Sequence, residues 1–214
     1  MYPMRQNVKR PYRSTRRREQ ATETRARIVG AARDLFVGSG YGRTTIAEVA
    51  NAAGVAVETV YATYHNKPTL LRQVWYETFR GDDEDIRLLD RPEIRAVLAE
   101  PDLATRLRAH ADVLTPVFRR ITPLLRALQG AATSEPAAEG MLAEFDERRL
   151  DAAGHYARAA AATGQLAVSE QECHDLFAAT MDGALWYRLV EQRGWSDERF
   201  AKMLSAMWIG ALIQ

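Results

Sequence analysis

The feature that most constrains the fold of this chain is a helical spacing of apolar residues that recurs along nearly its whole length. Strand-like alternation of β-branched residues is almost absent, whereas Ala, Leu, Arg and Glu are abundant. Glycine and proline interrupt the pattern at intervals typical of loops between helices. We therefore predict an all-α protein, with a small helical unit at the N-terminus and a larger helical body after it.

The same periodicity predicts where the individual helices lie. In the first third, one helix carries apolar residues from Ile28 to Phe36, two helices of about two turns follow, and a fourth begins at Pro68. A weakly patterned connector then reaches Pro101. The longer helices expected after it cover about 102–115, 117–131, 137–163, 169–192 and 196–213, with Pro116 separating the first two.

Several polar residues stand where a helix N-cap is expected. Thr44 or Thr45 precedes the first of the two short helices, and Glu48 lies in its first turn. Ser169 and Ser196 occupy the corresponding positions before the last two long helices. Only Ser169 is followed three residues later by a glutamate, Glu172, and this spacing predicts a capping box.

Charge is distributed unevenly along a chain whose net charge is only +1. Residues 1–80 hold 14 basic and 6 acidic side chains, and residues 81–214 hold 15 basic and 22 acidic ones. A basic end suggests a polyanionic partner, although a basic tail without a partner has the same composition. We expect residues 1–22 to form a flexible arm with a nonspecific electrostatic role; its basic residues include Arg5, Lys9, Arg10, Arg13, Arg16, Arg17 and Arg18.

Other features of the sequence concern the compartment. The longest apolar run, residues 206–213, is far shorter than the roughly 20 residues that cross a membrane, and the basic first residues lack the apolar segment of a secretory signal. The single cysteine, Cys173, cannot form an internal disulfide, and we expect it to be a packed apolar residue. We predict a cytoplasmic protein with no membrane partner.

The most informative segment is 44–67. Its two short helices are joined across Ala53-Gly54-Val55-Ala56, where the glycine allows a left-handed backbone and Val55 is placed to fill the gap between the helices. This arrangement is typical of a helix-turn-helix, whose second helix enters the major groove of DNA. A tight corner between two helices of an ordinary helical protein has the same spacing.

The residues of this segment resemble the DNA-binding domain of TetR-type transcriptional regulators. The resemblance covers about 50 residues, from the helix at Arg27 to Leu71, and weaker likeness is found at 182–185 and 193–196. It implies three parts: the arm (1–22), a three-helix DNA-binding domain (23–67), and a helical effector-binding and dimerisation domain (68–214).

The resemblance also implies DNA contacts. Thr45 would place a backbone N–H at a phosphate, and the groove side of the recognition helix departs from the family pattern, because Val57 and Glu58 stand in its first turn. Val57 suits a thymine methyl and Glu58 a cytosine amino group, or Glu58 only favours the helix N-terminus. Val60 and Tyr64 match core positions. The predicted DNA contacts are Thr44, Thr45, Val57, Glu58, Thr59, Tyr61, Thr63 and Lys67, with Tyr61 and Lys67 on phosphates.

For the body, the resemblance implies an effector pocket among the middle helices, although core packing explains any single aromatic residue equally well. Polar groups on apolar faces are the better candidates. The candidate pocket residues are His110, Phe118, Arg126, Phe145, Tyr156, Phe177 and Met181.

The last two helices carry more apolar residues than burial on one side needs, which predicts a dimer interface between two copies of the chain. The alternative is that these residues complete the core of a single chain. The candidate interface residues are Phe177, Ala184, Tyr187, Met207, Trp208 and Ala211.

The function predicted from these features is a homodimeric, ligand-responsive transcriptional regulator, most often a repressor, that binds a palindromic operator in double-stranded DNA and a small-molecule effector of unknown identity. No catalytic, phosphate-loop or metal-binding motif is present, so we expect no enzyme activity, cofactor or metal. The alternatives are a helical adaptor without a DNA role and a small helical enzyme or metal-binding protein that uses His110, His155 and His174.

Overall fold

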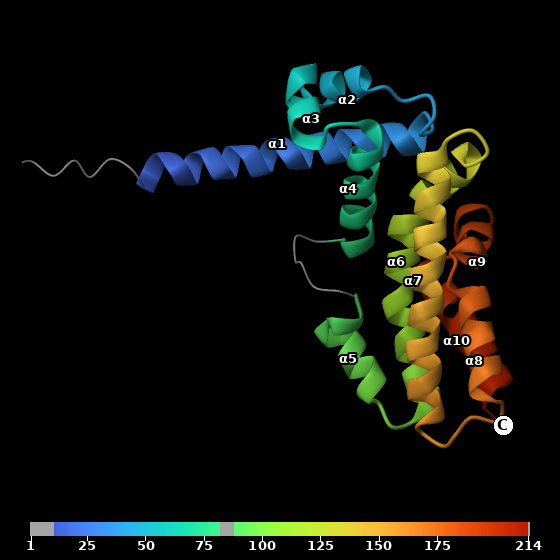
Figure 1. Ribbon diagram of the computed structural model, residues 1–214. Coiled ribbons are helices and arrows are strands. Elements are labelled where there is room, and N and C mark those ends of the chain that lie inside the picture. Colours follow the sequence, from blue (N-terminus) through green and yellow to red (C-terminus); the bar gives the residue numbers. More distant parts are fainter. Residues whose placement is uncertain (1–10, 82–87, 214) are drawn as a thin grey trace, which may run out of the picture.

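A computed structural model of the chain describes residues 11–81 and 88–213, and over these residues it is helical without strands (Figure 1). This confirms the prediction of an all-α protein with an N-terminal helix-turn-helix unit and a larger helical body. None of the described helices is long and apolar enough to cross a lipid bilayer. The helices are α1 (Pro11–Gly38), α2 (Ile46–Ala53), α3 (Val57–Tyr64), α4 (Lys67–Arg80), the 3₁₀ helix η1 (Leu88–Asp90), α5 (Pro92–Ala99), α6 (Leu103–Ala131), α7 (Pro136–Ala161), α8 (Glu170–Thr180), α9 (Ala184–Trp186), the π-helical turn η2 (Tyr187–Glu191) and α10 (Asp197–Leu212).

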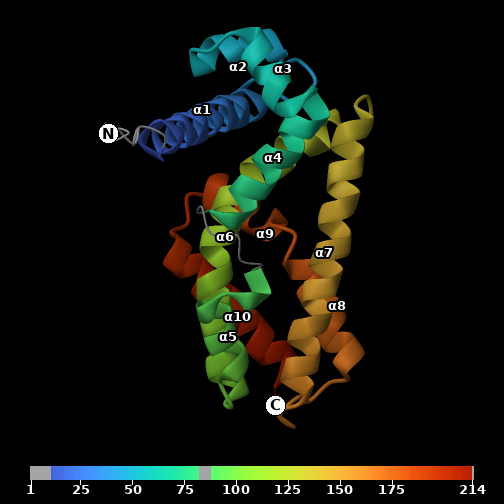
Figure 2. The ribbon, with the colours of Figure 1, turned by 60° about the vertical axis from the view of Figure 1, so that its left-hand side comes forward.

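The N-terminal unit lies across one end of an elongated body, and α4 runs from this unit along the body (Figures 1 and 2). The C-terminus lies at the end of the body opposite to α2 and α3 in both views. Two apolar cores hold the fold. One surrounds α1 to α4 and continues into the C-terminal half of α6 and the N-terminal half of α7, and the other joins the remaining halves of these two helices to α8 and α10.

Helix α1 begins earlier than expected. Residues 11–22 are helical and not the flexible arm that the sequence predicted, while residues 1–10 of that arm lie outside the described residues. Arginine, alanine and glutamate, which make up most of 18–27, are good helix formers, so the helix continues there although the side chains of 18–27 are largely exposed. Packing against the core begins only at Ile28.

Helix α6 is one helix and not the two that the sequence predicted, because it continues through Pro116 and Pro123. A proline inside a helix removes one backbone donor and costs about 3 kcal/mol. Leu114, Val117 and Phe118 are buried on either side of Pro116, and burying each large apolar side chain contributes about 1.5–3 kcal/mol. Packing along the whole length of the helix therefore outweighs the loss at the proline.

The segment predicted as one helix over 169–192 is interrupted. Helix α8 ends at Thr180, and the chain restarts at Ala184 after Gly183, whose φ of 80° is left-handed. A Cβ atom at Gly183 would lie 2.6 Å from the Thr122 hydroxyl, so glycine also permits close approach to α6. The predicted cap Ser169 forms a complete capping box with Glu172, as expected.

Candidate nucleic-acid interface and body cavity

The turn between α2 and α3 has the geometry of a helix-turn-helix. Gly54 ends α2 in the left-handed region (φ 64°), and its N–H donates to the carbonyls of Ala50 and Asn51. Val60 and Tyr64 of α3 are buried in the core, which confirms the positions expected for them. The burial of these two residues fixes which face of α3 packs against the protein and leaves the opposite face exposed.

Thr45 caps α2 through a complete capping box. Its Oγ1 accepts from the Glu48 N–H (3.2 Å), and the Glu48 carboxylate accepts from the Thr45 N–H (2.7 Å) and hydroxyl (2.9 Å). These hydrogen bonds lower the pKa of Glu48, with a smaller contribution from the charge of Lys67. Because the Thr45 N–H already donates to Glu48, the direct bond from this N–H to a phosphate that the resemblance implied needs the carboxylate to move.

The exposed face of α3 holds most of the predicted DNA contacts. Tyr61 is 49% exposed, and Glu58 is also exposed. Thr59 and Thr63 are half-buried, and the Thr63 hydroxyl donates to the Thr59 carbonyl (2.8 Å). Val57 is half-buried because it packs partly against the N-terminal core. A large aromatic side chain on an open helix face is available to a partner molecule.

Thr44 differs from the other candidates. It is only 2% exposed, and its hydroxyl donates to the carbonyls of Gly40 (2.9 Å) and Leu35 (3.2 Å). The side chain therefore ties the loop before α2 to the end of α1. The prediction that Thr44 contacts DNA finds no support in this geometry, because the hydroxyl faces the interior of the protein.

Lys67 begins α4 at the edge of the same surface. Its Nζ donates to the Gly42 carbonyl (3.2 Å) and lies 4.2 Å from the centre of the Tyr41 ring. An ammonium group has three N–H donors, so this one bond leaves others for a phosphate oxygen. The contacts with Gly42 and Tyr41 hold the positive charge near the loop that precedes α2.

A cavity of about 60 Å³ lies in the body between α4, α6 and α7, closed on one side by Met181. Four of the seven predicted pocket residues line it: Phe118, Phe145, Tyr156 and Met181. The other residues that line it are Trp75, Phe79, Leu114, Val117, Ile121, Arg148, Arg149 and Ala152.

The remaining three pocket candidates lie elsewhere. The His110 ring stacks behind Tyr156, with centroids 3.8 Å apart, and the centre of the Phe177 ring lies 5.5 Å from that of His110. These two residues therefore form the layer behind the cavity wall. Arg126 was wrongly placed in this pocket, because its guanidinium lies 4.7 Å from the ring centre of Tyr187 on another part of the surface.

The layer behind the cavity contains unpaired polar atoms. His110 is 2% exposed, and burial lowers its pKa to about 3, so the imidazole is neutral at physiological pH. Burial also raises the pKa of Tyr156 well above its usual value. Neither His110 Nε2 nor the Tyr156 hydroxyl has a hydrogen-bond partner among the described residues. Two such groups side by side in an apolar core are unusual, because buried polar atoms are nearly always paired.

A polar network that the sequence analysis missed connects α4 to α7 beside this cavity. The Glu144 carboxylate accepts from Tyr76 (2.8 Å), Arg72 (2.9 Å) and Arg148 (2.7 Å). Only the spacing of four residues between Glu144 and Arg148 was visible in the sequence, and it is also typical of an isolated surface pair. Because Arg148 lines the cavity, the network joins the cavity wall to the helix that follows the DNA-binding unit.

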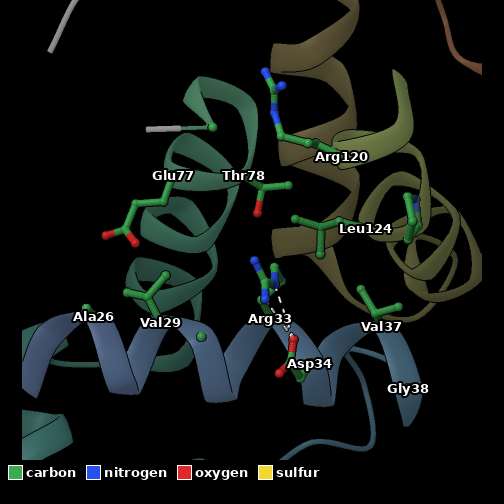
Figure 3. Close-up of a pocket in the computed structure, with 13 residues that line it drawn as sticks. Ala26, Val29, Arg33, Asp34, Val37, Gly38, Glu77, Thr78, Arg120 and Leu124 are labelled. Carbon is green, nitrogen blue, oxygen red and sulfur yellow. Dashed lines mark hydrogen bonds and ion pairs between the residues drawn. The ribbon is translucent and has the colours of Figure 1, made fainter. Parts of the chain in front are cut away.

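A second, open groove of about 600 Å³ lies where α1 meets α4 and α6 (Figure 3). Val29 and Val37 of α1 face Thr78 of α4 and Leu124 of α6 across it (Figure 3). The sequence analysis did not predict this groove. The N-terminal unit is therefore joined to the body across an incompletely filled junction.

The predicted dimer-interface residues fall into two groups, buried and solvent-accessible. Phe177 and Trp208 were wrongly assigned to a surface, because both are buried in the core of the single chain, where the Trp208 indole N–H donates to the Thr180 hydroxyl (3.0 Å). For Phe177 and Trp208, the alternative holds: they complete the core of a single chain. Ala184 and Ala211 are exposed, and Tyr187 and Met207 are half-buried.

The histidines of the body do not converge. His155 lies 3.8 Å from Asp151 and His174 lies 3.0 Å from Asp175, whereas His110 is buried among aromatic rings. Within the described ranges, no three histidine, cysteine or acidic side chains are grouped as metal ligands. The alternative of a metal-binding or enzymatic site built on these histidines is therefore not favoured. Cys173 is buried, and burial raises its pKa to about 11.

A helix-turn-helix whose second helix has an exposed face is typical of DNA-binding regulators. Residues 28–74 match the family described as bacterial regulatory proteins, tetR family. The HTH-type transcriptional regulator TtgR of Pseudomonas putida is 42% identical over 57 residues, which make up 27% of this chain and 27% of TtgR. The match thus spans about a quarter of the length of the curated relatives.

Solved structures share the fold over most of the chain. A protein of Saccharomonospora viridis in complex with choline has a TM-score of 0.67 at 17% identity, covering 90% of this chain and 99% of that one. SmeT in complex with triclosan has a TM-score of 0.66 at 20% identity, covering 89% and 92%. NalD, the secondary repressor of the MexAB-OprM multidrug efflux pump in Pseudomonas aeruginosa, has a TM-score of 0.59 at 19% identity, covering 91% and 98%.

The helix-turn-helix segment of this chain is thus similar in sequence to that of tetR-family regulatory proteins, and the fold is shared with these solved structures along about nine-tenths of the chain.

Proposed function

We propose that this protein is a ligand-responsive transcriptional repressor that binds a palindromic DNA operator as a homodimer. The observation that carries the proposal is the helix-turn-helix at 46–64, in which Val60 and Tyr64 fix α3 to the core and the opposite face is open. A helix held in this way fits the major groove of B-form DNA. Transcriptional regulation also places the protein with the chromosome, so the cytoplasm stays its predicted location.

On this proposal, two kinds of side chain contact DNA. Tyr61 and Lys67 bind phosphates, because both reach the edge of the surface and neither is buried in the core. Val57, Glu58, Thr59 and Thr63 lie in the groove, where Glu58 accepts from a cytosine amino group. Substitutions at Tyr61 and Lys67 then weaken binding to every duplex, whereas substitutions at Val57 or Glu58 change the preferred sequence.

Two lysines provide a matched test of the proposed phosphate contacts. Lys67→Ala removes the charge beside α2, and Lys202→Ala removes an exposed charge on α10, outside the N-terminal unit. Fluorescence anisotropy across salt concentrations measures the affinity of each variant for duplex DNA. We expect Lys67→Ala to weaken binding and reduce the salt slope by about 1, with Lys202→Ala unchanged. A wild-type protein without duplex affinity at low salt contradicts the DNA-binding proposal.

A palindromic operator requires a dimer with two-fold symmetry. The surface left for it on α9, η2 and α10 holds Ala184, Tyr187, Met207 and Ala211, and the small exposed residues of α10 permit close approach of a second copy. Introducing a charge by Ala211→Asp then yields a monomer that stays folded, as measured by sedimentation and circular dichroism. A dimer that persists in this variant places the interface elsewhere.

The effector proposal rests on how the cavity is connected to the DNA-binding unit. Trp75 and Phe79 line the cavity from α4, and only two residues separate the end of α3 from the start of α4. A molecule that enlarges the cavity displaces α4 and changes the spacing of the two recognition helices in the dimer, so that ligand and operator weaken each other's binding. The complexes of SmeT with triclosan and of the Saccharomonospora viridis protein with choline support a small-molecule ligand in this fold.

The three parts that the resemblance implied are kept as a proposal with one modification. The N-terminal core extends from α4 into the body, because Trp75 and Phe145 of α7 both belong to it and their rings meet edge to face, with ring centres 5.4 Å apart. Helix α4 therefore belongs structurally to both the DNA-binding unit and the body. We place the working boundary along this helix and not at residue 67.

A further inference from the structure

We propose that the body cavity binds a neutral aromatic molecule that carries one hydroxyl or carbonyl group, and that this group pairs with the Tyr156 hydroxyl. The inference rests on the proposed function, in that the cavity is taken as the effector site, and it adds the chemical class of the ligand. It is carried by the lining of the cavity, by the pairing of its charges and by its unsatisfied polar atoms.

The lining selects a flat, apolar molecule. Trp75, Phe79, Phe118 and Phe145 supply aromatic rings from three different helices, and aliphatic side chains of α6 fill the space between them. Aromatic side chains stack on a ligand ring or meet it edge to face, with favourable geometry for planar molecules. A long flexible chain makes fewer of these contacts.

The charges at the cavity favour a neutral ligand. Arg148 is paired with Glu144 (2.7 Å), and Arg149 is paired with Asp146 (3.0 Å) and donates to the Ala178 carbonyl. An anion therefore finds both cations already engaged. None of the described residues that line the cavity is acidic, so a cationic ligand finds no negative partner in the wall.

The Tyr156 hydroxyl supplies the polar contact. Tyr156 forms part of the cavity wall and is buried, and its hydroxyl has no partner among the described residues. The neutral His110 ring stacks directly behind it with a second unpaired atom, Nε2. A ligand hydroxyl or carbonyl that bonds to Tyr156 removes an unsatisfied buried group, which makes this bond a source of specificity.

The cavity is too small to accept such a ligand without movement of its wall. Pockets for small molecules measure roughly 300–1,000 Å³, whereas this one measures about 60 Å³. A bicyclic aromatic molecule therefore fits only when side chains of the wall move apart. Trp75 and Phe79 are the wall residues on α4, so opening the cavity on this side acts on the helix that leads to the DNA-binding unit.

Four probe molecules of one size test the inference on the full-length protein by isothermal titration calorimetry. They are 2-naphthol, 2-methylnaphthalene, 2-naphthoate and the 2-naphthyltrimethylammonium cation. We expect 2-naphthol to bind more tightly than both charged probes. We expect Tyr156→Phe to weaken the binding of 2-naphthol about fivefold, which corresponds to the loss of one neutral hydrogen bond. The affinity for 2-methylnaphthalene should not fall. Tyr64→Phe, which removes the hydroxyl of a buried tyrosine in the N-terminal core, leaves all four affinities unchanged.

Several results overturn the inference. A charged probe that binds more tightly than 2-naphthol excludes the neutral class, and the absence of binding by both neutral probes excludes the aromatic one. If Tyr156→Phe lowers thermal stability and leaves the preference for 2-naphthol unchanged, Tyr156 serves the fold and not the ligand. Because none of these measurements uses DNA, their failure is distinct from a failure of duplex binding, which contradicts the proposed function itself.

Discussion

The N-terminal unit and the body of this protein are both helical, but they differ in how fully their polar groups are paired and their interior space is filled. In the N-terminal unit, a capping box begins α2, a left-handed glycine ends it, and the buried Thr44 hydroxyl has two carbonyl partners. In the body, α6 runs through two prolines, and His110 and Tyr156 keep unpaired polar atoms beside a cavity. On the proposed function, the part that binds DNA, a partner of constant shape, is closely packed, while the part that responds to a ligand retains unfilled space and unsatisfied polar groups.

The largest expected effect concerns a residue that was expected at the dimer surface. Trp208→Ala removes a fully buried indole and its bond to Thr180, and it should lower the free energy of unfolding by about 3–5 kcal/mol, measured by denaturant titration. The control change Lys202→Ala, on the exposed side of the same helix, should change stability by less than about 0.5 kcal/mol. Comparable losses for the two variants contradict the placement of Trp208 in the body core.

The second effect uses the buried histidine of the body. The folded-state pKa of His110 is about 3, below the value of about 6.5 in the unfolded chain, so the unfolded state binds more protons between these values. Stability from this group is present above pH 6.5 and is lost as pH falls, by about 1.4 kcal/mol per pH unit. Between pH 6.5 and 5 this loss reaches about 2 kcal/mol, before most carboxylates begin to titrate.

His110→Phe should remove this dependence between pH 6.5 and 5, and His155→Gln, on the exposed face of α7, should keep it. Denaturant titrations at several pH values measure both slopes. A wild-type stability that is flat over this window shows that His110 is protonated or hydrated in the folded protein, and the contrast between the two regions then loses its main support.

The third effect compares matched capping boxes in the two regions. Thr45→Ala and Ser169→Ala each remove a side-chain cap that pairs with a glutamate three residues later, and each should cost about 1 kcal/mol of stability. Only Thr45→Ala should also weaken duplex binding, because it alters the start of α2 beside the proposed DNA surface. Equal effects of the two variants on anisotropy contradict the assignment of this surface.

The fourth comparison predicts effects of opposite sign at two glycines. Gly30 lies inside α1, where an added Cβ meets no atom within 4 Å, so Gly30→Ala should stabilise the protein by about 0.5–1 kcal/mol. Gly54 has a φ of 64°, and Gly54→Ala should destabilise by about 1–2 kcal/mol because an L-residue is strained there. Thermal unfolding measures both shifts, and a stabilising Gly54→Ala shows that the turn between α2 and α3 is not held in this conformation.

How far the sequence predicts the structure also differs between the two regions. Thr45, Glu48 and Gly54 act on neighbours within four residues, so their roles follow from local rules of capping and turn formation. The continuation of α6 through Pro116 depends instead on side chains from other helices that pack along it, and these are distant in sequence.

The candidate site shows the same limit. Phe118, Phe145, Tyr156 and Met181 were predicted because aromatic residues and methionine line apolar pockets, yet the same composition placed Trp208 at a surface that it does not reach. Hydrophobic periodicity tells which face of a helix is covered and not whether the cover is the same chain, a second copy or a ligand. The network around Glu144 joins this residue to Arg72 and Tyr76, about 70 positions away, and its only local signal was the four-residue spacing of Glu144 and Arg148.

The measurement that tests the account most directly is selection of binding sites from a pool of random duplexes by the full-length protein, repeated with Glu58→Ala. We expect the wild type to enrich a palindrome whose half-sites lie one helical turn or a multiple of it apart, and Glu58→Ala to enrich a palindrome of the same spacing with a changed base in each half-site. Failure of the wild type to enrich any sequence contradicts the central claim that α3 reads DNA.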